Sequence, residues 1–341
     1  MSRRVLITPI ILRALAAPRY AELLESHGFE PVFPARRDRA LTESDLLEEV
    51  PGCVAVLAGM EPFNRRVLTA AASALRTVAR VGVGYDAVDL AAATELGMVV
   101  TIAVGQNHDS VAEQAFGLMI GVLRRIVAHD RGLRHGQWLR ERTRPVRGLT
   151  LGLVGLGRIG QAMVTRARAF GMRVVAHDVS PPPGWGPDQG VEWCSMDELL
   201  RTADVISLHT PLTPATRHLI DARALSLMKP DAVLINTARG GLVDEAALLA
   251  ALQAGKLGGA GLDVFAAEPL PADHPLTRLD QVVLTPHTAG TDERAAADMA
   301  YAAAESVVQL AAGTWPEGCV VNPDVRPKWS ASASRTSGAT D

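Results

Sequence analysis

The sequence predicts an α/β protein with two doubly wound parallel-sheet domains, the second inserted into the first. Short apolar, β-branched runs alternate with segments rich in alanine, leucine and glutamate along nearly all of the 341 residues, which is typical of parallel sheets with crossover helices. A polar, arginine-rich segment, residues 131–148, separates two such series. With 48% hydrophobic and 21% charged residues, the chain is expected to be globular and long enough for two buried cores.

The first series supplies the strands of the outer domain. Residues 18–28 predict a helix between its first two strands, because Pro18 stands at the start and Gly28 follows the end. The strands are predicted from the apolar runs at 4–8, 29–33, 53–59, 75–81 and 98–103.

The chain is expected to return to the outer domain near its end. An alanine-rich segment from Asp292 to Ala312 predicts a helix that Gly313 stops. We therefore expect one domain from residues 1–101 and 290–325. The remaining residues, 326–341, are small and polar and predict a disordered tail.

The second series predicts the inserted domain, residues 102–289. A longer helix is expected from Asp109 to Arg125, before the arginine-rich connector. The predicted strands of this domain lie at 149–155, 172–178, 204–209, 232–238, 259–265 and 282–287.

A glycine pattern follows the first strand of the inserted domain. Gly155, Gly157 and Gly160 form a G-x-G-x-x-G motif directly between a strand and a helix. The first glycine permits the tight turn, the second lets the backbone approach a pyrophosphate, and the third lets helix and strand pack closely. The helix N-terminus then offers free N–H groups to phosphates. The motif therefore predicts a Rossmann-type dinucleotide site.

The next strand ends in an acid suited to the adenosine ribose. Asp178 lies 178 − 160 = 18 residues after the last glycine, where a carboxylate accepts hydrogen bonds from ribose hydroxyls. Its charge would repel a 2′-phosphate, and the following residues, 179–184, contain no arginine. We therefore expect NAD as the cofactor in preference to NADP.

Three polar residues follow later strands of the inserted domain. Arg239, Glu268 and His287 come after the predicted strands at 232–238, 259–265 and 282–287. Ligands of such sheets bind beyond the carboxyl ends of the strands. Arginine suits a carboxylate, and a histidine beside a glutamate can exchange a proton near neutral pH. Together they predict proton transfer coupled to hydride transfer at a hydroxyl-bearing carbon.

Charge, cysteines and ligand spacing exclude other classes. A net charge of −3 gives no basis for a nucleic acid or membrane partner. Cys53, Cys194 and Cys319 are widely separated, which argues against disulfides and zinc and favours a reducing cytoplasm. No histidine, cysteine or glutamate cluster has metal-ligand spacing, so no metal is expected.

In the order and number of its motifs, the chain resembles the D-isomer-specific 2-hydroxyacid dehydrogenases, most closely their phosphoglycerate dehydrogenase-like members. The resemblance covers about residues 50–325. It rests on "RVGVGYDAVDLAAATELGMVV", "NHDSVAEQAFGLMIGVLRR", "LGLVGLGRIGQAM", "SLHTPLTPATRHLI", "LINTARGGLVDEAAL", "GLDVFAAEPLPADHPL" and "LTPHTAG".

The resemblance implies a Rossmann NAD domain inserted into a flavodoxin-like substrate domain, and a homodimer formed through the NAD domain. It implies that Arg239 binds the carboxylate and carbonyl of the substrate, that His287 is the acid/base, and that Glu268 is its partner. The backbone of Val83 and Gly84 would hold the substrate carboxylate. Beyond the glycines, the NAD site would be lined by Arg158, Ile159, Asp178, Thr210, Pro211, Thr237, Ala238, Asp263, Ala289 and Gly290.

The sequence alone leaves more than one substrate possible within this family. Some phosphoglycerate enzymes carry an arginine–serine pair where this chain has the region of Met60 and Glu61, although Arg65, Arg66 or a partner's arginine offers another clasp. Reduction of hydroxypyruvate or glyoxylate is therefore the alternative within the family. An NAD-sensing, corepressor-like interaction protein is the alternative from another class, and the intact arginine, glutamate and histidine set argues against it. Formate or phosphite oxidation is a minor third option.

Overall fold

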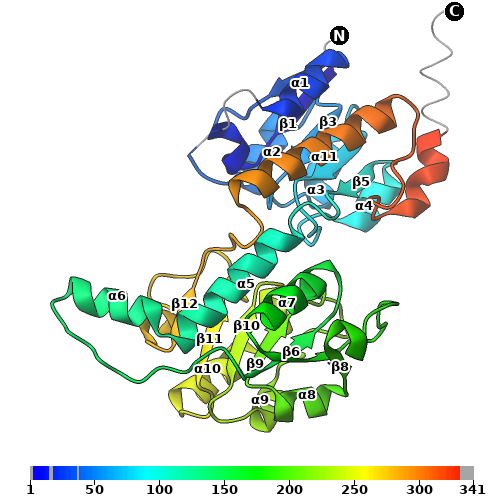
Figure 1. Cartoon of the computed structure of the whole chain (residues 1–341). Helices are drawn as coiled ribbons and strands as arrows, with labels where there is room; N and C mark the ends of the chain where they lie inside the picture. The colour runs from blue at the N-terminus through cyan, green and yellow to red at the C-terminus, as the bar shows by residue number, and fades with distance from the viewer. Residues whose placement is uncertain (1–2, 15–17, 37, 331–341) are drawn as a thin grey trace, which may run out of the picture. The chain divides into compact units, whose positions relative to one another are not determined.

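The computed structural model describes residues 3–14, 18–36 and 38–330. The chain divides into two compact units: unit 1 comprises everything up to Asn107 and from Thr291 onward, and unit 2 comprises His108–Gly290. Each unit is a parallel sheet with helices on both faces (Figure 1). This confirms the predicted fold class. None of the helices in the described ranges has the length and apolar character needed to cross a bilayer.

Unit 1 contains a five-stranded parallel sheet in the order β2-β1-β3-β4-β5. This is the flavodoxin-like order. Four of these strands lie within the apolar runs that predicted them, and β1 begins one residue before its run; strands covered on both faces of a parallel sheet are largely apolar. They are β1 (Arg3–Ile7), β2 (Phe29–Val32), β3 (Ala55–Ala58), β4 (Thr77–Arg80) and β5 (Val99–Ile102).

Helices cover both faces of the unit 1 sheet. On one face, Leu24 of α1 and Val307 of α11 share a core with Val5 of β1. On the other face, Leu68 of α3 shares a core with Val56 of β3, and α2 and α4 pack beside it. The segments of this unit are η1 (Ile10–Ala14), α1 (Arg19–Ser26), α2 (Glu43–Glu49), α3 (Arg65–Ala71), α4 (Leu90–Glu95), α11 (Glu293–Ala311) and η5 (Pro323–Val325).

The last long helix, α11, confirms its predicted start and stop. Asp292 is the N-cap, and its side chain accepts a hydrogen bond from the backbone N–H of Ala295 at 2.8 Å. The helix ends at the C-cap Ala312, and Gly313 follows with a φ of 79°, a left-handed conformation that suits glycine.

The predicted disordered tail is wrong in its first part. Residues 326–330 are helical. Lys328 donates hydrogen bonds from Nζ to the carbonyls of Thr94 and Glu95, and the Trp329 ring lies 5.2 Å from that of Trp315. The small, polar composition of the tail hid these two anchoring side chains. Residues 331–341 lie outside the described residues.

Unit 2 contains a seven-stranded parallel sheet in the order β12-β11-β10-β9-β6-β7-β8. Counted from β6, this is the Rossmann order with β12 as a further edge strand. The prediction missed β8, because three residues with a central glutamate give no strand periodicity. The strands are β6 (Thr150–Val154), β7 (Arg173–His177), β8 (Val191–Trp193), β9 (Val205–Leu208), β10 (Val233–Asn236), β11 (Gly259–Leu262) and β12 (Val282–Leu284).

Two layers of helices enclose this sheet. Met119 of α5 and Met163 of α7 share one core with Leu153 of β6, whereas Leu199 of α8 and Leu248 of α10 share the core on the other face. The segments of this unit are α5 (His108–Leu123), α6 (Ile126–Arg134), α7 (Arg158–Ala169), η2 (Pro187–Gln189), α8 (Met196–Thr202), α9 (Ala222–Leu227), η3 (Gly240–Leu242), α10 (Glu245–Gln253) and η4 (Pro275–Arg278).

The long helix predicted from Asp109 to Arg125 is confirmed as α5, but it stops two residues early. Arg125 takes a φ of 51°, which interrupts the helix, and α6 follows at once. The start of the segment predicted as a polar connector is therefore the end of a second helix, Ile126–Arg134.

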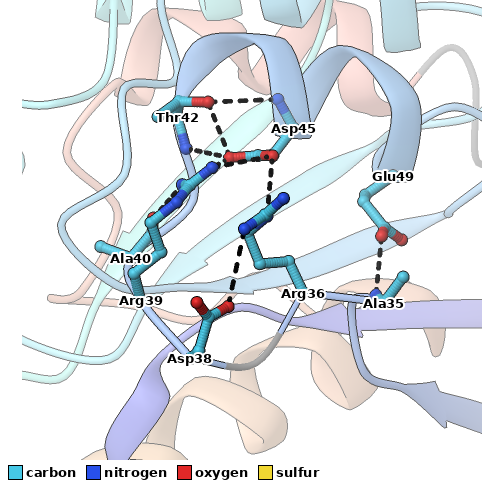
Figure 2. Close-up of polar contacts among 8 residues, drawn as sticks. All are labelled: Ala35, Arg36, Asp38, Arg39, Ala40, Thr42, Asp45 and Glu49. Carbon is cyan, nitrogen blue, oxygen red and sulfur yellow. Dashed lines mark hydrogen bonds and ion pairs between the residues drawn. The ribbon is translucent and has the colours of Figure 1, made fainter.

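A capping box fixes the start of α2 in unit 1 (Figure 2). The Thr42 hydroxyl accepts from the backbone N–H of Asp45, and the Asp45 carboxylate accepts from the backbone N–H of Thr42 at 2.7 Å. Hydrogen bonds from Arg39 and then from Thr42 lower the pKa of Asp45, and Arg36 lies 3.7 Å away. The box therefore needs an ionised Asp45.

Replacing Thr42 with alanine is expected to reduce the free energy of unfolding by about 1 kcal/mol, because the helix loses its N-cap. Since the pKa of Asp45 is lowered in the folded state, its contribution is complete above about pH 4 and declines as the pH falls. Urea unfolding at neutral and acidic pH measures both effects. Thr42→Ser keeps the hydroxyl and serves as the control; an equal loss in the two variants would contradict the capping role.

Candidate active site

The glycine turn after β6 is shaped by close backbone contacts. Gly155 has a φ of 95°, and a Cβ there would lie 2.6 Å from the carbonyl oxygen of His209. A Cβ on Gly160 would lie 2.4 Å from the carbonyl oxygen of Gly155. Around Gly157, which is the N-cap of α7, a Cβ would meet nothing within 4 Å. The turn is thus closed where helix and strand pack and open where a phosphate would approach.

The first residues of α7 continue this cradle. Arg158 and Ile159 are the first two residues of the helix and follow the Gly157 N-cap directly. Arg158 is exposed and Ile159 is half-buried. At this position the backbone N–H groups have no partner within the helix, so they can bind an anion.

Asp178 is tied to the same turn. Its Oδ2 accepts a hydrogen bond from the backbone N–H of Leu156 at 2.8 Å, and its Oδ1 accepts one from the backbone N–H of Ser180 at 2.9 Å. A carboxylate oxygen can accept more than one hydrogen bond, so both atoms can still accept from a ribose diol. The structure therefore places the acid beside the glycine turn, in an orientation that fits the adenosine end of a dinucleotide.

Two buried polar atoms lie unpartnered at the ends of neighbouring strands. Leu208 of β9 pairs with Asn236 of β10, which sets His209 beside Thr237. Among the described residues, neither His209 Nδ1 nor Thr237 Oγ1 has a hydrogen-bond partner. Such orphaned groups are costly unless a ligand or water satisfies them. This polar edge therefore fits a bound dinucleotide.

His209 itself was missed by the sequence analysis. Its Nε2 lies 2.9 Å from the hydroxyl of Ser207, and burial lowers the pKa of His209 to about 4, so the ring is neutral. The one available signal was a histidine ending the run "DVISLH". The predicted residues Thr210 and Pro211 follow it directly, at the same strand end.

Asp263 shapes the loop that carries His287. Its side chain is fully buried, and its carboxylate accepts from the Thr285 hydroxyl at 2.5 Å and from the backbone N–H groups of Thr288 and Ala289 at 2.9 Å. Ala289 is buried. These contacts of Asp263 thus lie within unit 2, and its contact with a cofactor stays a prediction, as does that of Gly290.

His287 and Glu268 form a close pair. Nδ1 of His287 lies 2.7 Å from Oε2 of Glu268, and the other carboxylate oxygen, Oε1, accepts from the backbone N–H of Phe265 at 2.9 Å. Burial acts to raise the pKa of Glu268. The hydrogen bonds from His287 and Phe265 and the charges of His287 and Arg239 outweigh it and hold that pKa below its usual value. The carboxylate is therefore ionised and can accept a hydrogen bond from the imidazole.

Arg239 joins this pair from the neighbouring strand end. It follows β10, as Glu268 follows β11 and His287 follows β12, and these three strands are neighbours in the sheet. Its Nη1 donates to the carbonyl of Ala238 at 2.6 Å, and its charge contributes to the lowered pKa of Glu268. Unit 2 thus brings all three predicted catalytic residues to one edge.

Val83 and Gly84 belong to unit 1, in the loop after β4. The buried Arg80 holds this loop, donating from Nε to the carbonyl of Gly84 at 2.8 Å and from Nη1 to that of Ala58 at 2.9 Å. Arg80 was not predicted from the sequence, because it is the last residue of a buried strand. The substrate role of Val83 and Gly84 stays a prediction.

A buried carboxylate and the lack of a metal-binding cluster limit which ligands the described residues can hold. Glu61, also in unit 1, is 4% exposed, and its Oε2 accepts from the hydroxyl of Thr8 at 2.6 Å. Across the described ranges, no group of three histidine, cysteine, aspartate or glutamate residues could hold a metal ion.

Comparisons with known proteins agree with this geometry. A family model described as "D-isomer specific 2-hydroxyacid dehydrogenase, NAD binding domain" matches residues 116–289. The D-3-phosphoglycerate dehydrogenase of Methanocaldococcus jannaschii is 40% identical over 84% of this chain and 55% of that protein. The glyoxylate reductase of Korarchaeum cryptofilum is 40% identical over 82% of this chain and 86% of that protein.

A solved structure extends the comparison. The D-lactate dehydrogenase of Aquifex aeolicus, complexed with NAD and lactic acid, has a TM-score of 0.81 and 28% identity, covering 94% of this chain and 99% of that one. The present chain spans about half the length of the phosphoglycerate dehydrogenase it matches. The family model covers more than half of this chain, and the resemblance drawn from the motifs is confirmed. The chain belongs to the D-isomer specific 2-hydroxyacid dehydrogenases, and unit 2 carries their NAD-binding domain.

Proposed function

We propose that this protein interconverts a D-2-hydroxy acid and its 2-keto acid with NAD. The observation that carries the proposal is the 2.7 Å contact between His287 and Glu268 at the strand edge that also bears Arg239. An acid/base, its orienting carboxylate and a cation for the substrate carboxylate are the groups this reaction requires. NAD, when bound, accepts or supplies the hydride.

His287 is proposed to move the proton. Its Nδ1 faces Glu268, so Nε2 is the nitrogen left to exchange a proton with the substrate oxygen. When a hydroxy acid is oxidised, Nε2 accepts the hydroxyl proton; when a keto acid is reduced, Nε2 returns it. The ionised Glu268 stabilises the imidazolium formed in the first case and present at the start of the second.

Arg239 is proposed to orient the substrate. A guanidinium presents parallel N–H groups that match a carboxylate or an α-keto acid. The backbone of Val83 and Gly84, in unit 1, is proposed as the second anchor of the substrate carboxylate. Gly155, Gly157, Arg158, Ile159 and Gly160 would hold the pyrophosphate of the cofactor, and Asp178 its adenosine ribose.

The substrate is either phosphorylated or small and unphosphorylated. The likeness to D-3-phosphoglycerate dehydrogenase supports the first, and the likeness to glyoxylate reductase over most of both chains supports the second. Glu61 favours the unphosphorylated class, because this buried carboxylate follows Met60 where some phosphoglycerate enzymes offer a basic clasp. Hydroxypyruvate or glyoxylate reduction is therefore the second candidate function.

We also propose a homodimer formed through unit 2. The segment that includes α6 exposes apolar side chains, which would be costly on a lone molecule. Trp138 is 79% exposed and Leu133 is 56% exposed. The other exposed apolar residues of this segment are Ile126, Val127 and Leu139. A cytoplasmic location is proposed as well, supported by three cysteines that form no disulfide.

The proposal is tested by the ultraviolet absorbance of NADH with phosphohydroxypyruvate, hydroxypyruvate and glyoxylate. The wild type is expected to oxidise NADH with at least one of them. His287→Gln is expected to lower kcat by about 10²-fold or more while NADH binding is retained, because the proton donor is lost. His27→Gln, an exposed histidine, is the control. Near-normal turnover in His287→Gln would reject the mechanism, and silence of the wild type on every acid would favour an NAD-sensing interaction protein.

Asp178→Ala is expected to reduce the preference for NADH over NADPH by about tenfold, because a carboxylate that accepts ribose hydrogen bonds and repels a 2′-phosphate is lost. Fluorescence titration with both cofactors measures the ratio. Asp188→Ala, which removes an exposed acid of the same unit, is the control. A wild type that binds both cofactors equally would refute the role of Asp178.

Trp138→Ser is expected to halve the mass measured by light scattering, because the proposed dimer loses its most exposed aromatic side chain. Val179→Ser is the matched control: Val179 is 96% exposed in the same unit but lies outside the segment of α6. A monomeric wild type, or an unchanged mass for Trp138→Ser, would count against the dimer.

A further inference from the structure

A second glutamate–histidine pair, Glu245 and His274, contacts the loop that carries Glu268. Oε1 of Glu245 is 3.3 Å from Nε2 of His274, and each side chain is 21% exposed. Glu245 is the first residue of α10, where a negative charge is favoured by the helix dipole. This pair has no place in the reaction proposed above.

The pair reaches the Glu268 loop through one backbone group. The other carboxylate oxygen of Glu245, Oε2, accepts a hydrogen bond from the backbone N–H of Ala266 at 3.1 Å. One residue earlier, the backbone N–H of Phe265 donates to Glu268 Oε1. Glu245 therefore binds the peptide next to the one that orients Glu268.

The same peptide also packs against Gly240. A Cβ on Gly240 would lie 1.9 Å from the carbonyl oxygen of Phe265 and 2.6 Å from the nitrogen of Ala266. The backbone after Arg239 thus lies directly against the Phe265–Ala266 peptide, a packing only glycine allows. The peptide is therefore in contact with both Gly240 and the carboxylate of Glu245.

His274 is oriented to donate a hydrogen bond to Glu245. The backbone N–H of Leu276 donates to its Nδ1 at 3.4 Å, so Nδ1 carries no proton in this arrangement and the ring proton lies on Nε2, facing Glu245. Both ring nitrogens are thereby engaged. His274 is thus a structural partner that fixes the carboxylate of Glu245, whereas His287 pairs through Nδ1 alone among its described contacts.

We propose that Glu245, held by His274, is a positioning residue for Glu268: by binding the Ala266 N–H it fixes the loop that keeps the Glu268 carboxylate against His287. This inference rests on the proposed acid/base role of His287 for its catalytic meaning, although the geometry it describes does not. Among the described residues, Arg239 acts on Glu268, and Asp263 accepts from the backbone N–H groups of Thr288 and Ala289, which directly follow His287.

The test follows the protonation of His287 by NMR, using ¹³C-labelled histidine in the full-length protein and His287→Gln to assign its signal. In Glu245→Ala, the titration midpoint of His287 is expected to fall by about one pH unit, because Glu268 no longer sits against the ring. The same variant is expected to lower kcat by about tenfold with unchanged NADH binding. Glu192→Ala, which breaks an ion pair with Arg173 at the opposite end of the sheet, is the control and should change neither quantity.

Glu245→Gln separates position from charge. Its amide oxygen can still accept from the Ala266 N–H, but its NH2 group cannot accept from His274 Nε2–H, so the midpoint of His287 is expected to fall less than in Glu245→Ala. An equal shift in Glu245→Gln and Glu245→Ala would overturn the proposal, because Glu245 would then act through its charge. An unchanged midpoint in Glu245→Ala would overturn it too. If Glu245→Ala does not fold, His274→Gln, which removes the imidazole support, is expected to shift the midpoint in the same direction, and no shift there would refute the proposal.

The NMR readout distinguishes this inference from the proposed function. A wild type inactive on every keto acid, combined with a shifted His287 midpoint in Glu245→Ala, would reject the reaction and retain the positioning role. An active wild type, combined with an unshifted His287 midpoint in Glu245→Ala, would retain the reaction and reject the positioning role.

Discussion

The parallel pairing of β9, β10, β11 and β12 is the constraint on which the candidate site depends. Because these strands run in one direction, the residues after each of them emerge at one edge of the sheet. His209, Arg239, Glu268 and His287 are separated by up to 78 residues in sequence (287 − 209) yet share that edge. An antiparallel partner anywhere in this set would send its loop to the opposite edge.

Close backbone contacts fix the loops that follow these strands relative to one another. At Gly155, Gly160 and Gly240, a side chain of any size would collide with a backbone carbonyl. The first two contacts close the turn proposed to bind the cofactor, and the third packs the loop after β10 against the loop after β11. Backbone against backbone leaves no flexible side chain to absorb a shift, so Gly240 limits where the Phe265–Ala266 peptide can lie, and Glu245 binds the N–H of that same peptide.

Much of this arrangement was predictable from the sequence, and the failures have physical reasons. The strand ends carrying Arg239, Glu268 and His287 were predicted because buried parallel strands are apolar runs and polar residues mark where they stop. The role of Asp263 within its own loop, the orphaned Nδ1 of His209 and the buried Arg80 were not, because each depends on contacts across strands that no local pattern encodes. The helix at 326–330 was missed for the same reason, since Lys328 and Trp329 act on distant residues.

The two glutamate–histidine pairs show how one chemistry serves two purposes. His274 has both ring nitrogens engaged, one by Leu276 and one by Glu245, so proton exchange there would break a hydrogen bond that holds the chain. His287 pairs with Glu268 through Nδ1, which leaves Nε2 to exchange a proton while the ring stays oriented. The lowered pKa of Glu268 keeps the orienting charge in place through that exchange. A neighbouring carboxylate alone therefore does not make a histidine an acid/base. The histidine also needs one ring nitrogen that makes no hydrogen bond within the protein.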